Sequence, residues 1–267
     1  MSSRKLVVPQ AEAKKLLSLP TREAEQLFQS YEKEQQLEII SATRNPKLRE
    51  ELYYLVPDCT ELIQESPTED VLQVLDTLLG TGLACGLLPC LSNEQFEEII
   101  DIALWNDGKL DEKSVSLWLF ELSECDRDDL SRLLGQMDMR IFAGLLKNRV
   151  KLKGALSALL IDEGIIDPNS ASIECKDEQA KAVLNAIWEA DADLFNQLLR
   201  EMFAIDKEAD AETELASALE KVKAERDERV KARDKKAGIK ITESELKRHV
   251  DLDALELDED EEENGNK

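Results

Sequence analysis

The sequence predicts an all-α protein, an array of short antiparallel helices followed by a charged C-terminal helix and a disordered acidic tail. Three observations predict this fold class. Apolar residues recur at helical spacing, as they do from Phe96 to Leu104 and from Leu194 to Phe203. Sustained period-two alternation, which is typical of strands, does not occur. Apolar residues make up 42% of the chain but aromatics only 4%, so the core is mainly aliphatic and suits packed helices.

Polar residues mark where many of these helices begin. Ser66–Glu69 and Ser92–Gln95 have the spacing of capping boxes, in which the first side chain accepts from a free backbone N–H. Thr21, Asp111, Asp126 and Asp177 are expected to cap four further helices. The expected helices are roughly 11–18, 21–30, 33–43, 46–55, 59–65, 67–79, 81–88, 92–105, 111–122, 126–136, 138–151, 153–163, 177–190, 191–203, 208–237 and 242–250.

The chain divides into three expected parts. Short helices with one apolar stripe are unstable alone, so stacking them predicts a helical-repeat or superhelical domain over residues 1–205. No aromatic residue follows Phe203, and residues 206–250 read as a charged helical extension. Residues 251–267 contain many acids and little to bury, so they are expected to be a disordered tail.

The stretch from Leu104 to Leu122 raises the question of a metal site. Its Asn-Asp-Gly-Lys-Leu-Asp segment looks like a cation-binding loop, but aligning Gly108 with the sixth EF-hand position puts Ala103 first and Trp105 third. Neither side chain can bind calcium. A joint between two helices accounts for the segment better, because Gly108 can adopt the left-handed conformation that ends a helix.

Charge and cysteine content narrow the possible partners and compartment. The net charge of −24 disfavours nucleic acid and anionic membranes as partners, and the basic stretch Lys147–Lys153 is interpreted as a solvated helix face. The most apolar stretch, Leu78–Leu91, is too short to span a bilayer, and the N-terminus lacks a signal peptide pattern. Five irregularly spaced cysteines are typical of a reducing compartment, so a cytoplasmic protein without membrane insertion is expected.

The sequence predicts no catalytic, cofactor-binding or metal-binding residue, and no cofactor. The single histidine, His249, lies in the expected flexible end and is a poor partner for a nucleophile. The glycine-containing segment Gly80–Gly86 lacks the pattern of a phosphate loop and is interpreted as close packing around small residues. Carboxylates are too abundant for any pair to be singled out, so a carboxylate-based active site stays open.

The segments "LSNEQFEEIIDIALWNDGKLD", "SVSLWLFEL" and "LLGQMDMRIFAGLLKNRV" within Leu72–Lys153 resemble an uncharacterised bacterial family, a domain of unknown function. In that family a helix ends in Asp-x-x-Leu-Trp, a short polar joint follows, and a second Trp-Leu helix packs back. The positions that carry the resemblance are Asp101, Trp105, Asp111, Trp118 and Asp138. The resemblance implies no activity.

The segment from Leu16 to Asp58 also resembles, more loosely, helical repeats of the MgtE magnesium-channel cytoplasmic domain and of the flagellar protein FliG. That resemblance implies a right-handed helical array used for regulation or protein docking. The leading hypothesis is therefore a non-enzymatic scaffold that binds an unknown protein partner. A regulator that responds to a divalent cation or small ligand is the alternative, and an enzyme with an unrecognised carboxylate site is the second.

Overall fold

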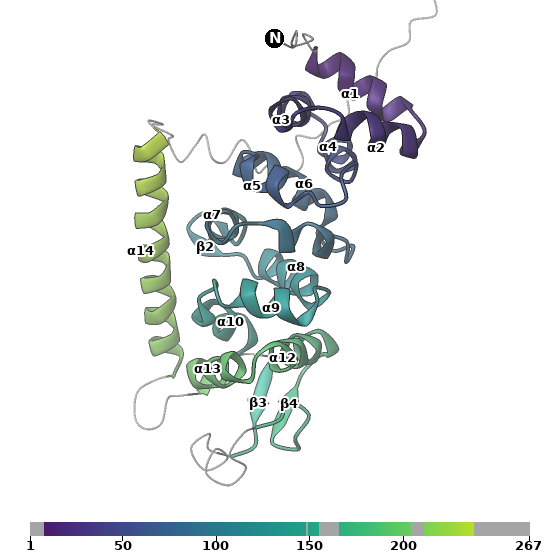
Figure 1. Ribbon diagram of the computed structural model, residues 1–267. Helices are drawn as coiled ribbons and strands as arrows, with labels where there is room; N and C mark the ends of the chain where they lie inside the picture. Colours follow the sequence, from purple (N-terminus) through teal and green to yellow (C-terminus); the bar gives the residue numbers. More distant parts are fainter. Residues whose placement is uncertain (1–7, 148, 155–165, 204–210, 238–267) are drawn as a thin grey trace, which may run out of the picture. The chain divides into compact units, whose positions relative to one another are not determined.

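Helices dominate the protein. The computed structural model describes residues 8–147, 149–154, 166–203 and 211–237 (Figure 1). Within these ranges the helices are α1 (Pro9–Ser18), α2 (Thr21–Gln29), α3 (Lys33–Ala42), α4 (Pro46–Tyr53), α5 (Thr60–Glu65), α6 (Thr68–Leu78), the 3₁₀ turns η1 (Ala84–Gly86) and η2 (Leu88–Cys90), α7 (Asn93–Ala103), α8 (Glu112–Ser123), α9 (Arg127–Leu134), α10 (Met139–Leu146), α12 (Glu178–Ala190), α13 (Ala192–Phe203) and α14 (Ala211–Ala237). None of them is long and apolar enough to cross a membrane.

The helices pack mainly against near neighbours in the chain, which gives the all-α array that the sequence predicts. α1 packs against α3, α4 against α6, α6 against α7, α9 against α12, and α10 against α13. Figure 1 shows the helices from α1 to α13 following one another in chain order. Their apolar stripes form one core in which large side chains such as Phe28, Phe96 and Phe142 are fully buried. Each short helix is thus stabilised by its neighbours rather than by its own length.

Buried polar side chains connect successive helices. Arg49, which is 3% exposed, donates to the carbonyl oxygens of Thr43 and Asp70 at 3.2 and 2.9 Å and pairs with the Asp70 carboxylate at 3.1 Å. The buried amide of Gln95 donates to the carbonyl oxygen of Ile63 at 2.9 Å. Thr43 follows the last residue of α3, so its carbonyl is one that has no partner within that helix, and the other two bonds link neighbouring helices through carbonyls of α6 and α5.

Two short antiparallel hairpins correct the expectation that the chain has essentially no strand. β3 (Val150–Leu152) pairs with β4 (Ile173–Cys175), and Val150 lies opposite Cys175. The expected helix 138–151 ends earlier, because α10 stops at Leu146 and Val150–Leu152 alternates buried and exposed side chains. The interpretation of Lys147–Lys153 as a helix face is therefore wrong. The second hairpin lies in the segment between α7 and α8.

The chain divides into two compact units, Met1–Ala224 and Glu225–Lys267, and the boundary falls within α14. In the first unit the side chain of Val222 is 2% exposed. Leu219 lies close to Gly144 of α10, since a Cβ on that glycine would be 3.2 Å from a Leu219 methyl group. The first part of α14 therefore buries apolar side chains.

Three sequence predictions fall wholly or mostly on residues outside the described ranges. They are the helix at 153–163, the helix at 242–250 and the disordered tail at 251–267. In the second unit the described residues, 225–237, continue α14 as a charged helix. Arg226 pairs there with Asp227 at 2.8 Å.

Candidate functional site

The loop that connects α6 to α7, residues 79–91, has an unusual backbone conformation. Gly80 and Gly82 have φ angles of 83° and 76°, which L side chains rarely adopt. A Cβ on Gly80 would also lie 3.3 Å from a methyl group of Leu117. The expected helix at 81–88 is replaced by two 3₁₀ turns, because the glycines permit tight turns and Pro89 has no N–H for an α-helical bond.

A buried carboxylate holds the start of this loop. Glu121 of α8 is 0% exposed, yet its oxygens accept hydrogen bonds from the backbone N–H groups of Thr81, Gly82 and Ala84, each at 3.0 Å. Three N–H donors compensate much of the cost of burying one negative charge. The glycine-containing segment therefore uses its backbone N–H groups on a carboxylate of the same chain.

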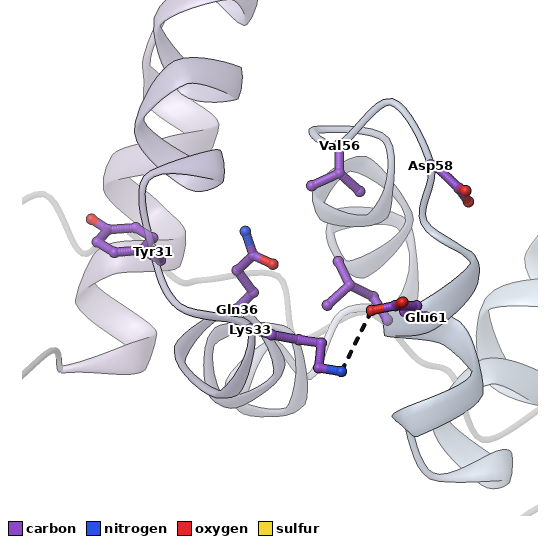
Figure 2. Close-up of a pocket in the computed structure, with 7 residues that line it drawn as sticks. Tyr31, Lys33, Gln36, Val56, Asp58 and Glu61 are labelled. Atoms are coloured by element: carbon purple, nitrogen blue, oxygen red, sulfur yellow. Dashed lines mark hydrogen bonds and ion pairs between the residues drawn. The ribbon is translucent and has the colours of Figure 1, made fainter.

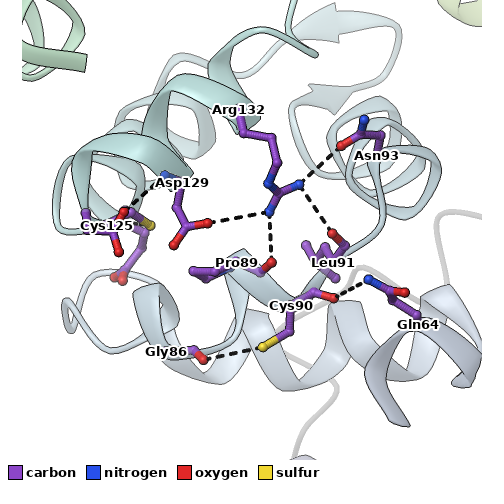
Figure 3. Close-up of polar contacts among 11 residues, drawn as sticks. Gln64, Gly86, Pro89, Cys90, Leu91, Asn93, Cys125, Asp129 and Arg132 are labelled. Carbon is purple, nitrogen blue, oxygen red and sulfur yellow. Dashed lines mark hydrogen bonds and ion pairs between the residues drawn. The ribbon is translucent and has the colours of Figure 1, made fainter. Parts of the chain in front are cut away.

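An arginine of α9 holds the end of the loop, as Figure 3 shows. The guanidinium of Arg132 donates to the carbonyl oxygens of Pro89 at 2.8 Å and Leu91 at 3.4 Å. It also donates to the side-chain oxygen of Asn93, at the start of α7, at 3.1 Å. The loop is thus fixed at both ends by charged side chains from α8 and α9.

Between these two anchors the loop exposes apolar surface. Leu83 is 61% exposed, and Tyr54, which follows α4, is 45% exposed. The Tyr54 hydroxyl packs against the loop at Gly86, where a Cβ would lie 2.9 Å from it. Half-buried Phe120 lies beneath the loop, 3.8 Å from the Cβ position of Gly82. We call Tyr54, Leu83 and Phe120 the loop patch.

Carboxylates flank the loop patch. Burial, together with the nearby carboxylate of Glu50, raises the pKa of Tyr54 to about 12. Burial, followed by the charge of Glu51, also raises the pKa of Glu50. On the other side, Glu124 packs 3.7 Å from the Cβ position of Gly82. The patch is therefore an apolar surface with an acidic rim.

The five positions of the predicted motif are distributed along α7, the hairpin, α8 and α10. Asp101 is buried in α7, and Trp105 lies on β1 (Trp105–Asn106). Asp111 caps α8 by accepting from the Lys113 N–H, and Trp118 is buried within that helix. Asp138 caps α10 in the same way. Two of the five residues, Asp111 and Asp138, thus cap helices, and two others, Asp101 and Trp118, are buried.

The joint itself is a β-hairpin. β1 pairs with β2 (Lys109–Leu110), and Trp105 lies opposite Leu110. The two turn residues, Asp107 and Gly108, have φ angles of 50° and 69°. Positive φ at both turn positions is typical of a type I′ turn, for which Asp-Gly is a favoured sequence. The segment is therefore a joint between α7 and α8, but Gly108 lies in the hairpin turn and does not end a helix as expected, since α7 stops at Ala103. The Asp-Gly pair was a signal for the hairpin.

A shallow hollow of about 350 Å³ lies between α3 and α5 (Figure 2). It is lined by Tyr31, Lys33, Gln36, Val56, Asp58, Glu61 and Leu62. Its charged groups already have partners within the protein. The Lys33 ammonium lies 3.5 Å from Glu61 and 2.7 Å from Glu65. Hydrogen bonds from the side chain and then the backbone N–H of Thr60 lower the pKa of Asp58. This hollow gives no specific argument for a ligand.

The cysteines are free thiols and gather mostly in one part of the molecule. Cys59 and Cys90 face each other, and Cys85 lies close enough to Tyr54 and Cys125 to contribute to the raised pKa of each. Burial raises the pKa of Cys125 to about 12. Across the residues that the structure describes, no group of three or more His, Cys, Asp or Glu side chains is arranged to hold a metal ion.

A match to a known protein family spans nearly all of the residues described above. The model of a family of unknown function, DUF6178, matches residues 24–230. The chain belongs to this family. The matched span of DUF6178 includes both anchors of the loop, the loop patch and all five motif positions, in agreement with the resemblance that the motif indicates.

Neither the curated proteins nor the solved structures contain a significant match to this DUF6178 chain. The resemblance to MgtE and FliG repeats therefore stays an expectation from the sequence. Sequence reasoning missed Glu121 and Arg132 as loop anchors. For Glu121 a signal existed, because a lone acid stands within the apolar run "SLWLFEL" of this DUF6178 chain. No comparable signal pointed to Arg132, which is one of many charged residues in a polar helix.

Proposed function

We propose that the chain is a non-enzymatic scaffold of the cytoplasm that docks a protein partner on the loop patch. The observation that carries the proposal is Leu83, which is 61% exposed at the middle of a loop held at both ends. A loop that is already ordered loses little conformational entropy on binding, so its exposed leucine contributes most of its burial energy to affinity. Among the described residues Val8 is exposed to a similar degree, at 64%, and Tyr54 is 45% exposed.

The acidic rim specifies the chemistry of the partner. Glu50, Glu51 and Glu124 lie around the loop patch, and the chain carries a net charge of −24. We infer that the partner is a protein segment with an apolar side chain flanked by Lys or Arg. Such a segment buries its apolar residue against Leu83 and Tyr54 while its cations neutralise the rim. Complementary charge mainly increases the rate and selectivity of association.

A helical-repeat architecture for the scaffold has its own support in two matching hydrogen bonds. The amide of Gln29 in α2 donates to the carbonyl oxygen of Leu55 at 2.9 Å, across 26 residues. The amide of Gln64 in α5 donates to the carbonyl oxygen of Cys90 at 3.2 Å, again across 26 residues. Equal separations at equivalent helix ends are expected of a duplicated unit. Stacked units of this kind commonly serve as binding surfaces.

Site-specific photocrosslinking tests the docking proposal. A photoreactive amino acid is placed at position 83 of the full chain in its native cell, and a matched probe replaces Val8, which is 64% exposed at the start of α1. The proposal expects a discrete protein adduct from position 83 that is absent from position 8, with a basic-apolar segment at the crosslink. The same adducts from both positions, or none from position 83, contradict it.

A further inference from the structure

Two thiols from distant parts of the chain lie within reach of each other. The sulfur atoms of Cys59, just before α5, and Cys90, at the end of η2, are 3.8 Å apart. A disulfide bond is about 2.05 Å long, so side-chain rotation and a small backbone shift are enough to bring the sulfurs together. The two residues are separated by 31 positions, and a bond between them links α5 to the anchored loop.

Hydrogen bonds to three consecutive carbonyl oxygens hold the backbone around Cys90 in place, as Figure 3 shows. Those of Pro89 and Leu91 accept from Arg132, and that of Cys90 accepts from the Gln64 amide at 3.2 Å. Cys59, by contrast, follows a connection without regular secondary structure. Any movement that closes the sulfur–sulfur distance therefore falls mainly on the Cys59 side.

The two thiols differ in acidity. The hydrogen bond between the Cys59 and Cys90 sulfurs, with a second one from the Thr60 side chain, lowers the Cys90 pKa to about 6 even though burial opposes this. The same hydrogen bond and its own burial raise the pKa of Cys59. Of the two thiols, Cys90 is therefore the more acidic and the one that more readily forms the nucleophilic thiolate. Cys90 is only half-buried, which leaves it open to a small reagent.

We propose that Cys59 and Cys90 form a reversible redox site in which a hydroperoxide converts the thiol pair to a disulfide. The Cys90 thiolate attacks one peroxide oxygen, the O–O bond breaks, and the other oxygen leaves as hydroxide and is protonated. Cys90 is now a sulfenic acid. The Cys59 sulfur then attacks the Cys90 sulfur, the S–O bond breaks, and the sulfenic oxygen leaves as water with the Cys59 proton.

The step balances, since two thiols and one hydrogen peroxide give one disulfide and two waters, with two electrons passing from sulfur to oxygen. A dithiol reductant reverses it by thiol–disulfide exchange. The disulfide links the connection between α4 and α5 to the loop that carries Leu83. Oxidation therefore covalently couples the α4–α5 segment to this loop. The proposal depends only on the thiol pair, so it stands or fails independently of docking.

Peptide mapping of the reduced full chain after treatment with equimolar hydrogen peroxide tests the proposal. Trypsin is unsuitable, because no Lys or Arg lies between positions 50 and 108 and both cysteines stay in one peptide. Cleavage after glutamate separates residues 52–61, which contain Cys59, from residues 70–94, which contain Cys85 and Cys90. In a Cys85→Ser variant only Cys90 remains in the second peptide, so the assignment is unambiguous.

The proposal expects a disulfide-linked pair of these peptides in wild type and in Cys85→Ser, loss of two of the five thiols in wild type, and full recovery with dithiothreitol. In Cys59→Ser, dimedone is expected to trap a sulfenic acid at Cys90. A Cys175→Ser variant serves as the control and oxidises like wild type. Equal oxidation of all thiols, a disulfide with a different partner, or no disulfide in the wild-type chain overturns the proposal, whether or not the variants fold.

Discussion

The carboxylate of Glu121 accepts a hydrogen bond at 3.0 Å from the backbone N–H of Ala84, 37 residues earlier in the chain. With the N–H groups of Thr81 and Gly82, this bond decides the conformation of the loop between α6 and α7. The bond is fully buried, so no water replaces it when a partner is lost.

Glu121→Gln is therefore expected to destabilise the chain. The amide of glutamine keeps one oxygen that can accept from Thr81 and Gly82. Its NH₂ group then faces the Ala84 N–H, and because both groups are donors, no hydrogen bond forms between them. The expected loss is about 2–3 kcal/mol in the free energy of unfolding, measured by urea denaturation. Exposed Glu124 provides the matched control, and Glu124→Gln should cost less than about 0.5 kcal/mol. Equal effects of the two variants would show that the buried carboxylate does not anchor the loop.

Trp118→Ala tests the core of the segment between the two tryptophans. Trp118 is 1% exposed within α8, so the truncation should cost about 3–5 kcal/mol in a urea melt. A substitution at Asp107, in the hairpin turn, is the control for Trp118→Ala, and it must suit the backbone conformation of that residue. Its φ angle is 50°, so Asp107→Ala places alanine in a left-handed conformation at a cost of about 1 kcal/mol, whereas Asp107→Gly avoids that strain. A loss on Asp107→Gly as large as that for Trp118→Ala contradicts the joint interpretation.

Much of the fold is predictable from this sequence, because its local signals are strong. The apolar stripe from Phe96 to Leu104 gives α7, and Asp111, Asp126 and Asp177 each cap the expected helix. The capping box at Ser92 is present with both of its hydrogen bonds. These features depend on residues only a few positions apart, which is the range over which sequence patterns are informative.

The sequence predictions fail where long-range contacts decide the structure. Ser66 has the spacing of a capping box, but its hydroxyl donates to the Leu62 carbonyl oxygen and accepts from the Tyr53 hydroxyl. The expectation that Thr21 caps a helix is also wrong, because α2 begins at Thr21 and Pro20 takes the N-cap position. The strands β3 and β4 are only three residues each and pair across a long connection, so no local pattern of useful length exists. The candidate site was missed for the same reason. Glu121, Arg132 and Leu83 come together only when α8 and α9 pack against the loop.

Truncation tests where the folded body ends. The sequence predicts that a fragment of residues 1–205 has a free energy of unfolding within about 1 kcal/mol of that of the full chain. The burial of Val222 increases the loss of stability expected on truncation, because removing one buried apolar side chain lowers the free energy of unfolding by about 1.5–3 kcal/mol. Guanidinium melts should therefore show residues 1–224 to be as stable as the full chain and residues 1–205 to be less stable by about 2 kcal/mol. Identical midpoints for the two fragments would mean that the first part of α14 contributes nothing.

The acidity of Cys90 gives a pH prediction. Its alkylation rate by iodoacetamide should rise with pH through a midpoint of about 6, since only the thiolate reacts and the Cys59 thiol stabilises it. Cys59→Ala removes that donor, so the midpoint should move up toward the ordinary thiol value. Cys125, whose pKa burial raises to about 12, is the internal control and should react slowly throughout the neutral range. A Cys90 midpoint that does not respond to Cys59→Ala contradicts the assigned hydrogen bond.

The most direct test of the docking account is the dissociation constant of the crosslinked partner, measured by calorimetry with the purified full chain. The account predicts that Leu83→Asp weakens binding roughly ten- to a hundredfold, because one buried leucine contributes about 1.5–3 kcal/mol. It also predicts weaker binding as salt screens the acidic rim, and no change for Val8→Asp. Wild-type affinity in Leu83→Asp, with an unchanged urea melt, would contradict the claim that this loop is the docking surface.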